Sequence, residues 1–124
     1  MLRLFIVGVG GAAGAISRYL LEGFVHSSIN SNFPLGTLTV NITGCFALGF
    51  LATLADEKFL FNPSVRMGIF VGFIGAFTTF STFTYETWAL LKDSQQLMAA
   101  LNVLLSLAGG FVGLLLGIIF ARII

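Results

Sequence analysis

The chain has 124 residues, of which 57% are hydrophobic and 9% are charged, and its mean hydropathy is +1.03. So few charged side chains could not cover a water-soluble domain of this size, so the composition excludes an ordinary soluble protein and indicates a small integral membrane protein. The formal net charge of +1, without any run of like charges, offers no surface for nucleic acid.

Four apolar stretches are long enough to form helices that cross the roughly 30 Å of hydrocarbon in a bilayer. They cover about residues 2–23, 35–55, 65–91 and 96–122. The connections between them are short, and both prolines stand just before a span, where a missing N–H costs little. The sequence therefore predicts a single membrane domain, residues 1–124, with four transmembrane helices.

The basic residues divide unevenly between the two ends of such a bundle. The end with the termini carries four and the opposite end two, namely Arg3, Lys58, Arg66 and Arg122 against Arg18 and Lys92. The positive-inside rule then gives a mild preference for cytoplasmic termini. The difference is too small to fix one orientation.

Glycines in the first and last spans recur on one helix face. Gly10 and Gly14 are four residues apart, and so are Gly109, Gly113 and Gly117. Such faces let a neighbouring helix approach closely. The letters GVGGAA in the first span also fit a dinucleotide fingerprint, but no βαβ unit follows them, so we expect no organic cofactor.

The second span carries Thr37, Asn41 and Gly44 at positions i, i+4 and i+7, so a hydroxyl, an amide and a gap share one helix face. Asn102 and Ser106 repeat this arrangement in the fourth span. Polar groups at bilayer depth are costly and usually face a protein interior or an aqueous path. They either bond neighbouring helices together or line a pathway.

The third span is the least regular, because residues 72–86, GFIGAFTTFSTFTYE, contain five Ser and Thr side chains and a carboxylate. Gly72 and Gly75 weaken helical propensity, and hydroxyls such as those of Thr78 and Thr79 can bond backbone carbonyls. We therefore predict a helix that is interrupted mid-membrane. A break frees carbonyls that can hold a cation and N–H groups that favour an anion.

Phe80 and Phe83 are three residues apart and share a helix face. The edge of a phenyl ring is electropositive, so an anion can lie against it in a low-dielectric pore. Ordinary packing is the alternative, because the chain holds 14 phenylalanines. The three polar faces together favour an ion path, and these residues alone do not name the ion.

No catalytic or metal-binding cluster is readable elsewhere in the sequence. The acidic residues are scattered and the single histidine, His26, is expected in a loop at the membrane interface. Cys45, the single cysteine, lies in an apolar run and is expected to pack as a small hydrophobe. We therefore expect the protein not to be an enzyme.

Three strings, GAAGAISRY at 11–19, GTLTVNITG at 36–44 and GFIGAFTTFSTFTYE at 72–86, closely resemble the Fluc (CrcB) family of microbial fluoride channels. The resemblance runs through all four spans and includes TTFSTF, the most specific string of that family. It implies a fluoride-selective channel in the bacterial inner or plasma membrane that lets F⁻ leave passively and so reduces cytoplasmic fluoride toxicity. It also implies an all-α fold, with an antiparallel, dual-topology homodimer of four-helix subunits, two pores and a central structural Na⁺.

The resemblance also implies roles for particular residues. The backbone carbonyls of Gly75 and Thr78 would hold Na⁺, Arg18 would be a vestibule arginine, and the role of Glu86 stays open between pairing with a cation and capping a helix. The implied fluoride pathway consists of Phe80, Phe83, Asn41, Thr79, Thr82, Ser106 and Thr37. Asn102 and Gly110 stand where some relatives have an aromatic residue and a hydroxyl, which leaves the lining from the fourth span open.

Two other classes of function compete with this interpretation. A small proton-coupled exporter of cationic drugs also uses four helices per subunit, but it needs a carboxylate deep in a span. A noncatalytic membrane assembly protein would use the glycine faces only to pack helices. It would show no transport.

Overall fold

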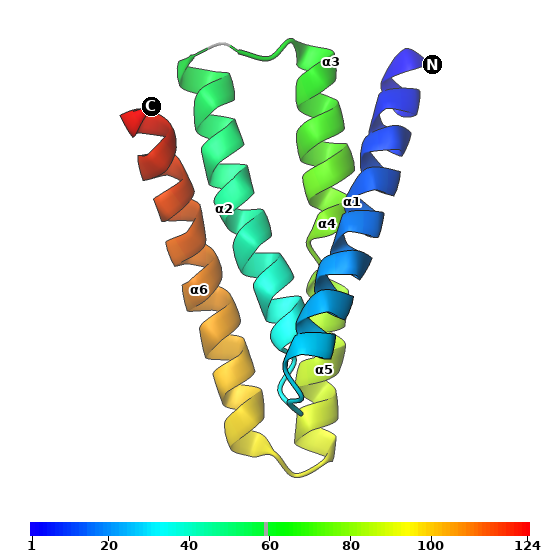
Figure 1. Ribbon diagram of the computed structural model, residues 1–124, viewed down its shortest axis with the longest axis vertical. Helices are drawn as coiled ribbons and strands as arrows, with labels where there is room; N and C mark the ends of the chain where they lie inside the picture. The colour runs from blue at the N-terminus through cyan, green and yellow to red at the C-terminus, as the bar shows by residue number, and fades with distance from the viewer. Residues whose placement is uncertain (59) are drawn as a thin grey trace.

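The computed structural model describes residues 1–58 and 60–124, and within them the chain is helical with four segments able to span a membrane (Figure 1). The predicted all-α fold with four transmembrane helices is therefore confirmed. The helices are α1 (Leu2–Ser28), α2 (Leu35–Glu57), α3 (Pro63–Arg66), the π-helical η1 (Met67–Ile74), α4 (Gly75–Phe77), α5 (Phe80–Lys92) and α6 (Gln96–Ile123).

The third span is interrupted between α4 and α5, as predicted from its glycines and hydroxyls. Thr78 has a φ of -80° and a ψ of 156°, and Thr79 has a φ of -146° and a ψ of 116°, so both residues are extended. The segments on the two sides of the break form one continuous span from Pro63 to Lys92 (Figure 1). The segment before α4, η1, is π-helical, and π-helical turns often occur at functional sites.

Helix α1 is longer than the apolar pattern predicted, because it continues past residue 23 to Ser28. The hydroxyls of Ser27 and Ser28 donate to the carbonyl oxygen of Phe24 at 2.9 and 2.8 Å, which satisfies an acceptor in the last turns. The expectation that His26 lies in a loop is therefore wrong. Bilayer thickness sets only the apolar length of a helix, and local hydrogen bonds extend it further.

Side chains cap the two segments of the third span where they begin. The Asn62 side chain accepts a hydrogen bond from the backbone N–H of Val65 at 2.9 Å, and Pro63 occupies the first turn. The Thr79 hydroxyl accepts one from the backbone N–H of Thr82 at 3.3 Å. The predicted helix start after Asn62-Pro63 is confirmed, and the break residue itself caps α5.

Glycines set the closest helix contacts, as their spacing predicted. On α6, a Cβ added to Gly113 would lie 2.9 Å from the Ile42 carbonyl oxygen of α2, and one on Gly117 would lie 2.8 Å from the Phe50 nitrogen. On η1, a Cβ at Gly72 would lie 2.8 Å from the Val7 carbonyl oxygen, and one on Gly14 of α1 would collide with the backbone of Phe73. The backbones therefore touch in two pairs, α2 with α6 and α1 with η1.

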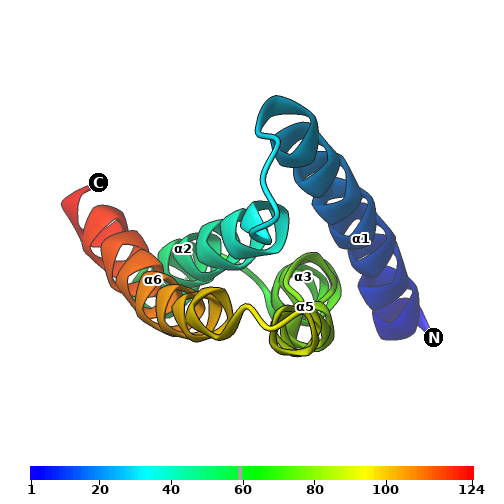
Figure 2. The ribbon, with the colours of Figure 1, turned by 90° about the horizontal axis from the view of Figure 1, so that it is seen from below.

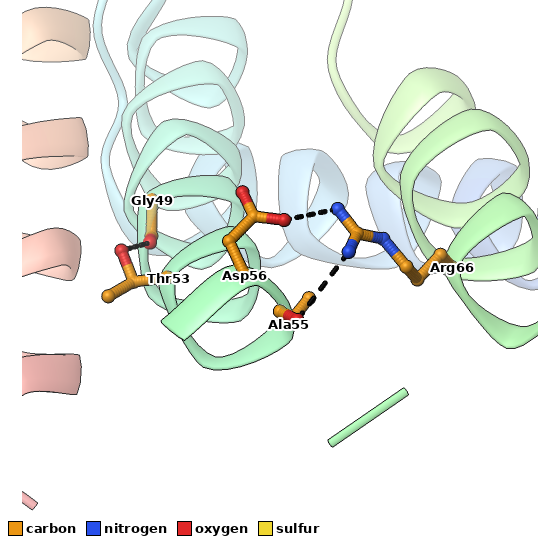
Figure 3. Close-up of polar contacts among 5 residues, drawn as sticks. All are labelled: Gly49, Thr53, Ala55, Asp56 and Arg66. Atoms are coloured by element: carbon orange, nitrogen blue, oxygen red, sulfur yellow. Dashed lines mark hydrogen bonds and ion pairs between the residues drawn. The ribbon is translucent and has the colours of Figure 1, made fainter. Parts of the chain in front are cut away.

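Two ion pairs hold the end at which both termini lie. Arg66 bonds Asp56 and also donates to the Ala55 carbonyl at 3.5 Å, near the C-terminus of α2 (Figure 3). Arg122 pairs with Glu57 at 2.7 Å. Both pairs are exposed and each contributes little to stability, about 0–1 kcal/mol. They join the C-terminal end of α2 to the end of α3 at Arg66 and to the last turn of α6 at Arg122.

The remaining surface of the bundle is mostly apolar. Figure 1 shows both termini at the same end, and Figure 2 shows α6 beside α2 on one side and α1 on the other. Leucines, isoleucines and phenylalanines along α1 and α6 are exposed. Four spans with apolar outer faces make this a multi-pass membrane protein, whose outer faces meet lipid or another chain.

The glycine contacts predict different effects for two similar substitutions on α1. Gly14→Ala should destabilise the protein by about 1–3 kcal/mol, because the new methyl group would force α1 away from Phe73. Gly8→Ala is the matched control, since nothing lies within 4 Å of a Cβ there. Reversible unfolding in detergent measures both, and equal effects of the two substitutions would contradict the assigned contact.

Candidate functional site

The helix break opens onto a cavity of about 230 Å³ among α2, the third span and α6. We call it the break pocket. Most of its lining is apolar, and the polar groups lie around the interruption. The lining residues are Asn41, Gly44, Cys45, Leu48, Ile74, Thr78, Thr79, Phe80, Phe83, Ser106 and Leu107. The structure thus brings together five of the seven residues predicted for an anion pathway.

Asn41 binds the backbone at the break through both groups of its side-chain amide. Its Oδ1 accepts a hydrogen bond from the Thr79 N–H at 2.8 Å, and its Nδ2 donates to the Thr79 carbonyl oxygen at 3.1 Å. An asparagine amide has two N–H donors, so one remains for another acceptor. Because Asn41 lines the break pocket, that donor is available for an anion there.

The interruption frees the backbone carbonyls of residues 75–78, and two of these, on Gly75 and Thr78, lose their helical donors to side chains. In a continuous α-helix each would accept a hydrogen bond from the N–H four residues later. The N–H of Thr79 donates to Asn41 instead, and the N–H of Thr82 donates to the Thr79 hydroxyl. These are the two carbonyls predicted to hold a cation, and freed carbonyls at a half-helix end are suited to Na⁺.

Hydroxyl groups form a short chain beside the pocket. Thr79 donates to the Thr82 hydroxyl at 2.9 Å, which leaves the Thr82 proton for a further acceptor. The Thr79 and Ser81 hydroxyl oxygens are 3.4 Å apart. Ser106 adds a hydroxyl to the pocket from α6. Thr82 itself adjoins the pocket through Thr79 but is not among its lining residues.

The two phenylalanines share one face of α5, as their spacing predicted. Their ring centroids are 5.7 Å apart and the rings are tilted by 48°. Phe83 is 9% exposed, whereas Phe80 is 77% exposed. Both rings line the break pocket, but most of the Phe80 ring points out of this single chain. The exposed part of Phe80 therefore faces lipid or another chain.

A second cavity, of about 320 Å³, lies at the end of the molecule opposite the termini, where the connection between α1 and α2 crosses. We call it the loop pocket, and its polar residues include Tyr19, Glu22, Thr37 and Glu86. The Thr37 hydroxyl donates to Glu86 Oε1 at 2.8 Å. Glu86 therefore neither pairs with a basic side chain nor caps a helix among the described residues.

Two carboxylate oxygens beside the loop pocket are buried without a hydrogen-bond partner among the described residues. They are Oε1 of Glu22 and Oε2 of Glu86. Burying a charged oxygen without a donor is unfavourable, so such groups in membrane proteins mark ion or proton paths more often than packing. Glu86 also lines a neighbouring cavity toward Asp93, so the loop pocket opens toward that end of the bundle.

Arg18, the predicted vestibule arginine, lies on α1 one helical turn before Glu22 and is partly exposed. It lines neither the break pocket nor the loop pocket in the described part of the chain. Residues that the sequence analysis did not place in a site are Glu22 and Cys45, which line the two cavities. The acidic side chain of Glu22 at the end of an apolar span was the available signal for the first, and none existed for the second.

Asn102 is the fourth-span residue whose role the sequence left open. It is 1% exposed, and its Nδ2 donates to the Thr87 hydroxyl at 2.9 Å. Thr87 in turn donates to the Phe83 carbonyl at 2.8 Å. Asn102 therefore joins α6 to α5 as a packing contact. Gly110 is also buried, and a Cβ at this position would lie 3.3 Å from the Cys45 sulfur. Because glycine has no side chain, this position adds no hydroxyl to the fourth span.

Comparisons with known proteins agree on one family. Residues 5–118 match the family model described as "CrcB-like protein, Camphor Resistance (CrcB)". The chain is 44% identical over 122 residues to a protein of Desulforapulum autotrophicum and to one of Geobacter sulfurreducens, with 98% of each chain covered. It is 47% identical over 120 residues to a protein of Chlorobium chlorochromatii, covering 97% of this chain and 92% of the relative. All three relatives are named "Fluoride-specific ion channel FluC".

The bond between Thr37 and Glu86 predicts a specific coupling. Thr37→Val should cost about 2 kcal/mol in unfolding free energy, because it removes the donor from a buried carboxylate. In a Glu86→Gln background the same change should cost much less, since a neutral amide tolerates the loss better. A double-mutant cycle by unfolding in detergent measures the coupling, and additive effects would contradict the assignment.

Proposed function

The chain belongs to the CrcB family of fluoride-specific ion channels, which it matches over nearly its whole length, and we propose on this basis that fluoride crosses the membrane through the break pocket. The protein is a channel and not an enzyme. Within the channel function, passive movement of F⁻ down its gradient protects the cell from cytoplasmic fluoride. The observation that carries the pathway is the meeting of amide, hydroxyl and ring edges at one helix break.

A fluoride ion in the break pocket would exchange water for fixed donors. The second N–H of Asn41 and the hydroxyl of Ser106 can each donate a hydrogen bond, and the edges of Phe80 and Phe83 add positive potential. Such donors act strongly because the surrounding lining is apolar and the local dielectric constant is low. The hydroxyl chain through Thr79 and Thr82 extends the donors along α5, toward the end of the bundle where Thr37 lies.

We further propose that the channel works as a homodimer. Phe80 is 77% exposed although it lines the pocket, so one subunit covers only part of this wall. An antiparallel, dual-topology arrangement is compatible with the weak charge bias between the two ends, four basic residues against two. A two-fold axis would duplicate the pocket, which gives two pores per dimer.

The carbonyls of Gly75 and Thr78 fit a small structural cation such as Na⁺. Each has lost its helical donor to a side chain, and carbonyl oxygens are the ligands that such an ion prefers. When bound, Na⁺ would supply a fixed positive charge that offsets the carbonyl dipoles at the break. The ligands are backbone carbonyl oxygens, so the place of Gly75 and Thr78 in the break matters more than the side chains that they carry.

The proton-coupled exporter receives no support. The relatives are named as fluoride channels. The carboxylates nearest the interior, Glu22 and Glu86, lie in the loop pocket and not in the break pocket. An exporter of organic cations would need an acidic group in the pathway itself.

The pathway predicts a defined loss of transport in one variant. In liposomes loaded with potassium fluoride, a potassium ionophore should trigger fast fluoride release. In liposomes loaded with potassium chloride, the same ionophore should release no chloride. Phe80→Ile should slow fluoride release by about two- to tenfold, because a contact with an aromatic ring contributes about 0.5–1.5 kcal/mol and each 1.36 kcal/mol is tenfold in rate. An ion-selective electrode follows each anion.

Phe111→Ile is the matched control for this experiment. Phe111 is an exposed phenylalanine on α6 that lies outside the break pocket, so its replacement should leave the rate unchanged. Equal slowing in both variants would place the pathway elsewhere. Chloride release at the rate of fluoride release from the native chain would contradict selective conduction.

A further inference from the structure

The extended backbone at Thr78 and Thr79 creates a local problem that the helix cannot solve. In hydrocarbon every backbone N–H and C=O needs a partner within the protein, because water is absent. The break removes the helical acceptor of the Thr79 N–H, and Thr79 is 7% exposed and so buried in the protein. Some other group must therefore accept from this N–H, and the carbonyl, at the N-cap of α5, has a lone pair for a further donor.

The Asn41 side chain supplies both partners at once. Its Oδ1 accepts from the Thr79 N–H at 2.8 Å and its Nδ2 donates to the Thr79 carbonyl at 3.1 Å, a pairing like that between two extended strands. A carboxamide has the same donor and acceptor as a peptide group. Aspartate would keep the acceptor and lose the donor, and alanine would lose both.

Helix α2 is shaped to accept the break at this height. Gly44 lies three residues after Asn41 on the same face, and a Cβ there would collide with the Thr78 side chain and lie 3.2 Å from the Phe77 ring. The backbone of α2 thus leaves room for Thr78 while Asn41 bonds Thr79. The neighbouring Val40 is 0% exposed, which fixes the rotation of α2 about its axis.

We propose that Asn41 is a positioning residue for the cation site. By bonding the Thr79 N–H it keeps that donor away from the Gly75 carbonyl, and by holding Thr79 extended it lets the Thr79 hydroxyl take the N–H of Thr82. Both actions keep the carbonyls of Gly75 and Thr78 free. The inference rests on the sodium site that we propose above. It gives Asn41, which also lines the break pocket, a second role, so the affinity for Na⁺ depends on a residue of that pocket.

The test is a sodium titration of thermal stability in detergent, at constant ionic strength with N-methyl-D-glucamine replacing Na⁺. The native chain should gain stability as Na⁺ rises, by mass action on the folded state. Asn41→Ala should raise the Na⁺ concentration for half of this gain at least tenfold. A purely structural role would lower the melting temperature without moving that concentration.

Asn102→Ala is the matched control, because it also deletes a buried carboxamide that bonds one helix to another but does not touch Thr79. It should lower the melting temperature at every Na⁺ concentration and leave the half-point unchanged. Equal half-points for the native chain, Asn41→Ala and Asn102→Ala would overturn the inference. A native chain without any sodium response would overturn both the sodium site and this inference, whereas fluoride release tests the channel separately.

Hydrogen exchange provides a measurement that does not depend on sodium. The amide of Thr79 should exchange slowly in the native chain, and at least tenfold faster in Asn41→Ala, because its acceptor is lost. Asn41→Asp should keep the amide slow, since a carboxylate still accepts this bond. Fast exchange in the native chain, or no change in Asn41→Ala, would show that Asn41 does not hold the break.

Discussion

The central constraint on this structure is that a broken helix inside a bilayer must find new partners for its backbone. The break at Thr78 and Thr79 meets this constraint through one side chain, Asn41 on α2, which bonds both polar groups of Thr79. An unsatisfied backbone group in hydrocarbon costs several kcal/mol, so this pair stabilises the break. The free carbonyls, the cap of α5 and the break pocket all follow from it.

The glycines explain how α2 comes close enough to do this. Gly44 admits Thr78 against α2, and Gly113 and Gly117 bring α6 into backbone contact with the other side of the same helix. Close approach replaces the missing hydrophobic driving force in a membrane, where lipid tails are as apolar as leucine. Helix α2 is thus the central element of the subunit, in contact with the third span and with α6 (Figure 2).

Local patterns in the sequence predicted most of the fold and the composition of the site. The four spans, the interruption near Gly75 and the start at Asn62-Pro63 depend on hydropathy, propensity and capping, which act within a few residues. The bonds from Asn41 to Thr79 and from Thr37 to Glu86 join positions 38 and 49 residues apart. No periodicity contains such pairings, so the second role of Asn41 and the buried oxygen of Glu22 could be found only in three dimensions.

The most direct test of the account is the reversal potential of a reconstituted planar bilayer, measured with a tenfold fluoride gradient and an independent pH gradient. For a passive fluoride conductor we expect a reversal potential of about 59 mV in magnitude. The fluoride gradient alone sets this potential, so inverting the pH gradient should leave it unchanged. A reversal potential that follows the pH gradient, or one that stays at zero under the fluoride gradient, would contradict selective fluoride conduction by this chain.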